Sequence, residues 1–115
     1  MVLKIIIKNL QKKIPVKPRK IREAVLRAVF LEGIKINGER SRTIKEPVSI
    51  CFVDDASIRK LNLKYLHVDS PTDVLAFDSY DIVISAQTAL KNSGIFHTSL
   101  EYELCLYAVH GMLHI

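Results

Sequence analysis

The spacing of apolar residues changes along the chain, and each change predicts a helix or a strand. Residues 2–7 and 48–53 are short apolar runs rich in β-branched side chains, which predicts two strands. Residues 73–77 and 81–85 are predicted to be strands on similar grounds. Between residues 21 and 30, apolar side chains instead recur every three or four positions, so we expect an amphipathic helix there.

Three further helices are predicted from polar residues placed to cap them and from their apolar stripes. Asp54 offers a carboxylate to the first turn of a helix that runs to about Tyr65. A short helix is expected over about residues 86–92. The last helix is expected to start at Thr98, because Thr98 and Glu101 have the spacing of a capping box.

Together these elements predict the fold class. A chain of 115 residues, of which 49% are hydrophobic, can form one domain with its own core. We expect an α+β fold, a single small domain of residues 1–115 in which a mixed sheet of about four strands is covered by helices. The polar stretch 34–46 is expected to be a loop that turns at Asn37-Gly38.

The composition is typical of a cytoplasmic protein. No run of about 18 apolar residues is present, so no membrane span is expected. The apolar start is interrupted by Lys4, is followed by Lys8 and lacks the cleavage site of a signal peptide, so we interpret it as a strand. Cys51 and Cys105 lie in apolar runs, which is typical of reduced, buried thiols and predicts no disulfide.

Charge is distributed unevenly between the two parts of the chain. Residues 1–45 hold 13 Lys or Arg and 3 Glu, whereas residues 46–115 hold 4 Lys or Arg and 9 Asp or Glu, which together give the net charge of +5. A basic part of this kind indicates a surface for a polyanion such as RNA. The alternative is that these cations only solvate a helix and a loop. The candidate RNA contacts are Lys12, Lys13, Lys17, Arg19 and Lys20.

His110 and His114 are four residues apart in a stretch predicted to be helical. At this spacing the two imidazoles emerge about 40° apart and one turn apart, so both can reach one ion. Neutral imidazole is a ligand of zinc and related divalent metals. Because the helix is mostly apolar, we expect the pair to be buried, where each imidazole without a partner would cost about 1–3 kcal/mol. Two core histidines bonded to carbonyls or carboxylates are the alternative.

Gly111 lies between the two histidines and needs a reason, because glycine costs a helix about 1 kcal/mol. It indicates that another backbone, a ligand or a substrate approaches closely. It also replaces the glutamate that acts as general base in metallopeptidase helices, so a peptidase of that kind is not expected. A catalytic zinc normally has three protein ligands. We therefore expect a third ligand beyond Ile115, in a C-terminal end that this domain lacks.

Three stretches resemble the YbeY family of bacterial rRNA-maturation endoribonucleases. HGMLHI, residues 110–115, resembles the start of the family signature His-Gly-x-Leu-His-Leu-x-Gly-Tyr-Asp-His. LNLKYLHVDSPTDVLAF, residues 61–77, resembles the family's Leu-Asn-x-x-Tyr-Arg … Pro-Thr-Asp-Val-Leu-Ser-Phe segment. DIVIS, residues 81–85, resembles the family strand Gly-Asp-Ile-x-Ile-Ser. With the order of the elements, the resemblance covers most of the chain.

The resemblance implies a metal-hydrolase-like fold with a metal-binding C-terminal helix. It also implies a metal-dependent endoribonuclease that cuts single-stranded RNA in rRNA processing and ribosome maturation. One divalent ion, with zinc as the expected metal, would be held by His110, His114 and a histidine six residues after His114. The implied partners are rRNA and, further, a ribosomal subunit or ribosomal proteins. Asp73 is a candidate general base from its position alone, and a structural carboxylate at the start of a strand is the alternative.

The chain departs from the family pattern at several positions. Leu66 stands where the family has an arginine implicated in activity, so a cation that could hold phosphate is missing, with Lys64 or His67 as candidate replacements. Ala76 replaces a serine, and Tyr80 replaces a glycine. The link before residue 81 is also shorter than in the family, which would fit residues missing near position 79.

Two other functions stay open at this point. Leu66 favours a non-catalytic RNA-binding or ribosome-assembly factor with a structural metal site, although such sites usually have four protein ligands. A metal-dependent hydrolase of small molecules is the other alternative. The basic part of the chain speaks against it, since a small neutral substrate needs no such field.

Overall fold

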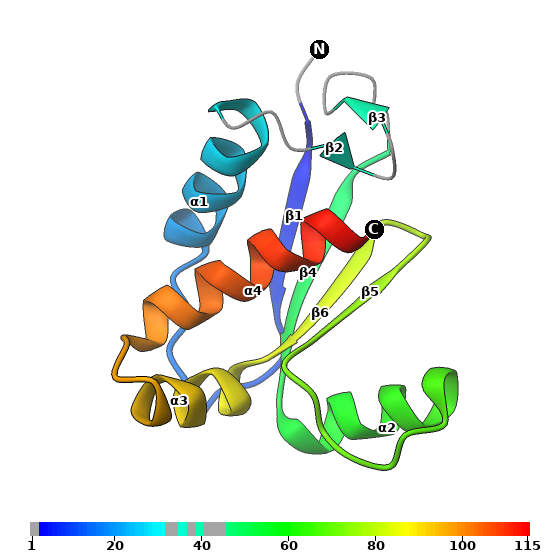
Figure 1. The fold of residues 1–115 in the computed structure, drawn as a ribbon, viewed down its shortest axis with the longest axis vertical. Helices are drawn as coiled ribbons and strands as arrows, with labels where there is room; N and C mark the ends of the chain where they lie inside the picture. Colours follow the sequence, from blue (N-terminus) through cyan, green and yellow to red (C-terminus); the bar gives the residue numbers. More distant parts are fainter. Residues whose placement is uncertain (1–2, 32–34, 37–38, 41–45) are drawn as a thin grey trace.

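Four strands form one mixed sheet in the order β1–β4–β6–β5 (Figure 1). The computed structural model describes residues 3–31, 35–36, 39–40 and 46–115. β1, β4 and β6 are parallel to one another, and β5 pairs with β6 in the antiparallel sense, so the predicted mixed sheet is confirmed. The strands are β1 (Ile5–Asn9), β4 (Val48–Val53), β5 (Val74–Phe77) and β6 (Asp81–Ser85).

Three helices cover one face of this sheet: α1 (Pro18–Leu31), α3 (Ala86–Ile95) and α4 (Leu100–His114) (Figure 1). Side chains alternate between the two faces along a strand, so every second strand residue points to these helices. The fully buried residues Ile50 of β4 and Ile82 of β6 are examples. The helices pack their own buried residues against these strand residues. These helix residues are Ile21, Val25, Val29, Ala86, Ala89, Leu104, Tyr107, Ala108 and Met112.

The other face of the sheet is covered by α2 (Asp55–Leu66). Ile58 of α2 is fully buried against Val53 of β4 and Leu75 of β5. Phe77 of β5 packs at the border of this smaller cluster. The edge strand β5 therefore has α4 on one side and α2 on the other.

The predicted start of α2 is confirmed, and its end lies one residue later than predicted. Asp54 Oδ1 accepts the backbone N–H of Ser57 at 2.8 Å. The helix ends at Leu66 because His67 takes a left-handed conformation with φ 59° and donates its N–H to the carbonyls of Asn62 and Leu63. Figure 1 shows α2 ending close to the edge of the sheet that β5 forms.

The last helix, α4, begins with a different cap from the one predicted. Ser99 Oγ accepts the backbone N–H of Tyr102 at 3.0 Å, so Ser99 is the N-cap. The prediction of a Thr98 cap is wrong because Thr98 completes the end of α3, donating its N–H to the carbonyl of Ser93 at 3.0 Å. The Thr98 hydroxyl donates instead to Glu103 at 2.7 Å.

β5 and β6 are joined by a tight turn of three residues, 78–80. The turn closes with the Tyr80 N–H donating to the Phe77 carbonyl at 3.1 Å. Tyr80 has φ 64°, the left-handed conformation that a three-residue hairpin loop requires and that glycine adopts without strain. The glycine expected here from the family pattern is thus explained, and the hairpin closes without additional residues near Ser79.

A second, two-stranded sheet pairs β2 (Lys35–Ile36) with β3 (Glu39–Arg40). The interpretation of residues 34–46 as a plain loop is therefore wrong. Asn37-Gly38, the predicted turn, joins the two strands but lies outside the described residues. Both cysteines are free, as predicted, and they pack on opposite faces of the main sheet. Among the described helices, none is long and apolar enough to cross a membrane.

Candidate metal centre and RNA-binding surface

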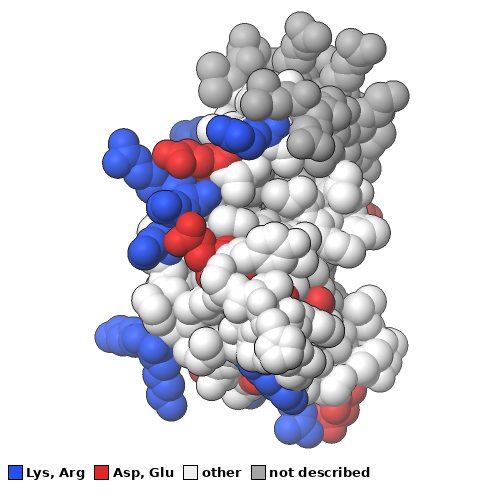
Figure 2. All heavy atoms as spheres, turned by 60° about the vertical axis from the view of Figure 1, so that its left-hand side comes forward, with Lys and Arg blue, Asp and Glu red and all other residues white. Residues whose placement is uncertain are grey.

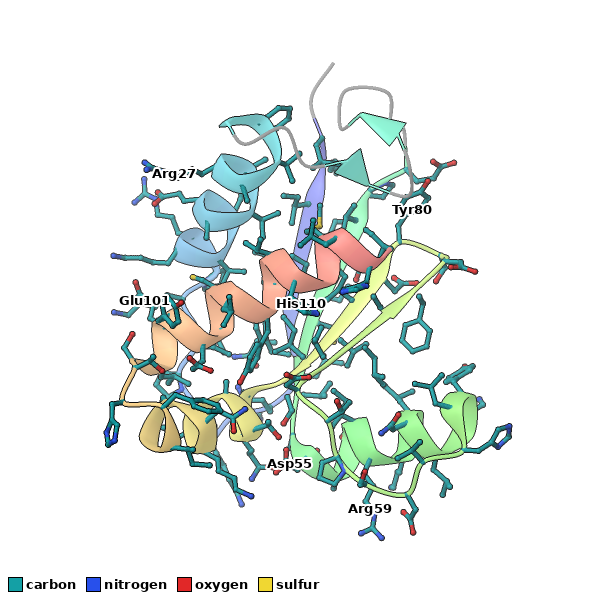
Figure 3. All side chains as sticks on the ribbon, viewed as in Figure 1. Arg27, Asp55, Arg59, Tyr80, Glu101 and His110 are labelled. Atoms are coloured by element: carbon teal, nitrogen blue, oxygen red, sulfur yellow. The ribbon has the colours of Figure 1, made fainter. Side chains whose placement is uncertain are left out.

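His110 and His114 lie side by side on the last turns of α4. Their ring centroids are 4.6 Å apart, with an angle of 33° between the ring planes. Figure 3 shows His110 on the part of α4 that crosses above the β5–β6 edge of the sheet. The helical spacing therefore brings the two imidazoles together, as the sequence predicts.

The expected burial of this pair is wrong, because both histidines are exposed. α4 buries Tyr107, Ala108, Gly111 and Met112 against the sheet, and the imidazoles emerge at the border of this buried face, beside β5. An exposed imidazole can bond to water, so the cost of burial does not argue for a metal here. The argument rests on the spacing and on what surrounds the pair.

Gly111 is explained by a close approach, but not by a ligand or a second backbone. A Cβ atom at position 111 would lie 2.6 Å from Cγ2 of Ile82 and 3.2 Å from its Cδ1. Ile82 is fully buried in β6, where it has no room to move away. The glycine lets the last turns of α4 lie directly on the sheet and carries the two histidines toward the edge strand.

A surface pocket of about 280 Å³ collects the histidine pair and several other predicted residues. One wall is the α4 side, with His110 and His114, and Asp73 lies at the start of the opposite wall on β5. Leu66, at the position of the family's arginine, closes the pocket from the end of α2. The complete lining is Leu66, Asp73, Val74, Leu75, Ala76, His110, Gly111 and His114.

Asp73 makes hydrogen bonds at the start of β5 and also lines the pocket. Its Oδ1 accepts the backbone N–H of Val74 at 2.7 Å and the hydroxyl of Thr72 at 3.3 Å. Its carbonyl accepts the N–H of Ser85, so the residue also starts the pairing of β5 with β6. Asp73 thus has a structural role, and it lines the same pocket as the two histidines.

A buried polar network lies one to two turns before His110 on α4, and the sequence did not predict it. The Tyr107 hydroxyl donates to Glu103 Oε1 at 3.0 Å and accepts from the Asn92 amide of α3 at 2.7 Å. Thr98 donates to the other Glu103 oxygen at 2.7 Å. The signal that could have revealed it is Glu103, an acidic residue on the face of α4 that its apolar neighbours bury.

Burial raises the pKa of Tyr107 to about 12. The hydrogen bond to Glu103 and the negative charges of Glu103 and Asp73 act in the same direction, whereas the hydrogen bond from Asn92 acts against them. Tyr107 is only 5% exposed. The hydroxyl is therefore a neutral donor at physiological pH, and its electrostatic coupling to Asp73 links the network to the pocket.

The donor set fits two of the ligands of a zinc site. Zinc binds imidazole nitrogen at about 2.0–2.1 Å in tetrahedral geometry, which places two rings on one ion about 5 Å apart between centroids. The observed 4.6 Å is close to this separation. Within the described residues, no group of three His, Cys, Asp or Glu side chains is arranged to hold a metal. His110 and His114 are thus a pair of neighbouring donors and not a complete site.

The five cations predicted to contact RNA are exposed, but they lie away from the histidine pair. Lys17 and Lys20 approach Glu101 at 3.9 and 3.6 Å, and Arg19 approaches Glu23 at 3.8 Å. Figure 2 shows Lys and Arg side chains gathered along the α1 side, with acidic groups between them. Glu101 is separated from His110 by about 14 Å along the axis of α4. The structure therefore does not bring the basic residues into the pocket.

The fold and the histidine pair define a small α+β protein whose last helix presents two neighbouring imidazoles at the edge of a mixed sheet. A sequence model of the family described as endoribonuclease YbeY matches residues 6–115. The chain belongs to this family, which confirms the resemblance seen in its motifs.

Similar proteins span different shares of the chain. The endoribonuclease YbeY of Moorella thermoacetica is 41% identical over 87 residues, covering 59% of this chain and 56% of the relative. That of Clostridioides difficile is 33% identical over 111 residues, covering 84% and 67%. The chain spans about half the length of the Moorella relative and of a similar relative from Pelotomaculum thermopropionicum.

A solved structure supports the fold. The solution structure of a target protein from Thermotoga maritima superposes with a TM-score of 0.62 at 24% identity. The match covers 96% of this chain and 70% of the other. The arrangement of helices on a mixed sheet is thus shared with a protein of low sequence identity.

Proposed function

We propose that the chain acts as a metal-dependent endoribonuclease on single-stranded RNA in rRNA processing and ribosome maturation, in the cytoplasm. The observation that carries the proposal is the pocket in which His110, His114 and Asp73 meet. Membership of the endoribonuclease YbeY family supports the reaction class. The partners would be rRNA and a ribosomal subunit or its proteins.

His110 and His114 would hold one divalent ion, and zinc is the ion that such imidazoles suit. The third ligand would be the histidine that the family signature places six residues after His114. When bound, the ion would polarise a phosphoryl oxygen and lower the pKa of a bound water. Asp73 would accept a proton or orient the substrate, since it lines the same pocket.

The basic residues on and before α1 would bind the RNA backbone away from the site of cleavage. Lys12, Lys13 and Arg19 are exposed, and phosphate contacts of this kind do not depend on base sequence. Because they lie at the opposite end of α4 from the histidines, the RNA would cross α4 to reach both. The two regions would then contribute separately, one to affinity and one to chemistry.

The metal assignment is tested by measuring bound metal in the protein and in the variant His110→Ala. We expect the variant to lose most of its zinc after dialysis, measured by mass spectrometry of the metal, and to lose cleavage of single-stranded RNA. His97→Ala removes an exposed histidine in the link between α3 and α4 and is the matched control. Unchanged metal content in His110→Ala would reject the ligand assignment, and cleavage that survives chelation would reject a metal-dependent reaction.

A non-catalytic RNA-binding factor is the second candidate, and Leu66 is the observation that favours it. Among the described residues that line the pocket, none is Lys or Arg, so no cation there holds the phosphate. The variant Leu66→Arg restores the family residue at an exposed position, and we expect it to raise the cleavage rate by at least tenfold without a loss of stability. If neither the original protein nor the Leu66→Arg variant cleaves RNA detectably, the RNA-binding factor is favoured.

A further inference from the structure

The end of α2 presents an exposed apolar surface next to the pocket. Its two members, Tyr65 and Leu66, are 51% and 58% exposed. We call these two residues the α2 rim. Leu66 belongs both to the rim and to the lining of the pocket, so the two surfaces are continuous. Exposed apolar side chains gathered at the mouth of a site indicate a contact surface.

Tyr65 is the aromatic residue of the rim, and a residue of β5 supports its ring. Its ring contacts Phe77 of β5 edge to face, with 5.3 Å between centroids and 70° between planes. Phe77 is half-buried beside the cluster of Val53, Ile58 and Leu75, so it is a fixed support. Tyr65 is therefore anchored on the sheet while about half of its surface faces solvent.

A cation lies beside this ring. Lys64 Nζ is 5.2 Å from the centroid of Tyr65, within the range of a cation–π contact. Arg59 and Lys60, one turn earlier on α2, are also exposed. An exposed aromatic and apolar rim beside a lysine suits a ligand with flat apolar groups and a negatively charged backbone, which describes a single-stranded nucleic acid.

The segment after the rim is fastened to α2 by three contacts. His67 closes the helix, and the Asn62 amide donates to the carbonyl of Ser70 at 3.0 Å. Arg59 Nε donates to Asp69 Oδ1 at 2.7 Å. These contacts fix the direction in which Tyr65 and Leu66 leave the helix. A rigid aromatic surface loses little conformational freedom on binding, which favours stacking.

We infer that the α2 rim is a nucleobase-binding subsite, in which Tyr65 stacks on an unpaired base adjacent to the phosphate that enters the pocket. Leu66 contacts the edge of the same base. The Lys64 ammonium leaves the Tyr65 ring and binds a backbone phosphate instead. This inference rests on the proposed function, because it assigns one part of the RNA substrate. It also gives Leu66 a role, since an apolar residue at this position contacts a base where an arginine would contact phosphate.

The test uses the absence of tryptophan from the chain. The variant Tyr65→Trp introduces a single reporter at the rim. Phe96→Trp places a control reporter at the end of α3, because Phe96 is 62% exposed and is not among the candidate RNA contacts. The probe is a short single-stranded RNA, mixed with metal-free protein so that no cleavage occurs. We expect RNA to quench the fluorescence of the Tyr65→Trp variant and to leave that of the Phe96→Trp variant unchanged.

Affinity provides the second measurement, by anisotropy of a labelled RNA. Tyr65→Ala is expected to weaken binding about 5- to 100-fold, whereas Phe96→Ala has no effect. RNA with one abasic position in register with the rim is expected to bind the original protein as weakly as Tyr65→Ala binds intact RNA. Urea unfolding of Tyr65→Ala verifies that the variant is folded.

These outcomes separate the subsite from the proposed reaction. Metal-dependent cleavage together with unchanged RNA affinity of Tyr65→Ala would overturn the inference and leave the reaction standing. Quenching at Tyr65→Trp in a protein that never cleaves RNA would support the subsite and reject the reaction. If Tyr65→Ala loses association with ribosomal subunits but binds the oligonucleotide normally, the rim contacts a protein and the inference fails.

Discussion

Gly111 shows at the scale of one residue how packing decides what the sequence leaves open. A glycine between two histidines could make room for a ligand, a second backbone or a neighbouring side chain. The structure selects the side chain, because the missing Cβ would lie 2.6 Å from Ile82. The position of the histidine pair thus depends on how the neighbouring Gly111 packs on the sheet.

Gly111→Ala is expected to destabilise the protein although alanine is the better helix former. The added methyl group would overpack the contact with Ile82, and the net loss is expected to be about 1–2 kcal/mol in the free energy of unfolding. Gly94→Ala is the matched control, because a Cβ at position 94 of α3 meets no atom within 4 Å. Urea unfolding should show that the control is as stable as the original or more stable. Equal gains in both variants would contradict the packing explanation.

The residues of the candidate site differ in how far the sequence could reveal them. The spacing of His110 and His114 is a local property of one helix, so it was predictable. Their exposure depends on which face of α4 meets the sheet, and this is settled only by contacts with distant residues such as Ile82. Asp73 was a candidate from its sequence position alone, and its place in the pocket needed the fold.

At the scale of elements, the Tyr107 network joins α3 to α4. Asn92 belongs to α3, Tyr107 and Glu103 belong to α4, and Thr98 lies in the link between them. Buried hydrogen-bonded groups of this kind fix one arrangement of two helices, since a shift would leave them without partners. The network therefore holds the helix that carries the histidine pair.

Tyr107 makes the free energy of unfolding depend on pH in the alkaline range. Burial raises its pKa from 10.0 to about 12, so between these values the unfolded chain releases a proton that the folded protein retains. Stability from this group is full below pH 10 and is lost as the pH rises toward 12. We expect Tyr107→Phe to flatten this decline and to cost about 1–3 kcal/mol at neutral pH, because Glu103 loses a donor. Unfolding followed from pH 8 to 12 measures both effects, and Tyr102→Phe, at an exposed position, should leave the curve unchanged.

The element boundaries show where local signals are sufficient and where they fail. Asp54 caps α2 as predicted, because its partner Ser57 is three residues away. Thr98 and Ser99 are both suitable caps, and the choice between them depends on how α3 ends. The strands β2 and β3 were missed because each is only two residues long, too short for a periodic pattern.

At the scale of the whole molecule, the two predicted functional regions occupy different ends of α4. The uneven charge was visible in the sequence, but the separation of the basic residues from the histidines was not. Lys17 and Lys20 approach Glu101 at the first turn of α4, and His110 lies toward the last. This arrangement predicts that RNA affinity and metal binding can be changed independently.

Salt dependence tests this separation. Replacing Lys12, Lys13 and Arg19 by glutamine is expected to weaken binding of single-stranded RNA and to reduce the slope of log affinity against log salt by about 2. Zinc content should not change, because the replaced residues lie far from the histidines. Lys91→Gln, an exposed cation on α3, serves as the control and should leave the slope unchanged. A loss of zinc in the triple variant would contradict the separation.

The position of β1 in the sheet has a consequence for how the chain folds. β1 pairs only with β4 within the main sheet, and Ile5 is opposite Val48, so a long loop must close before the first strand has a partner. The hairpin of β5 and β6 and the two helices after it are local in sequence and can form sooner. We therefore expect β1 to be incorporated into the sheet late. During that interval an apolar strand is exposed to aggregation, and the charges of Lys4 and Lys8 beside it would oppose association with other chains.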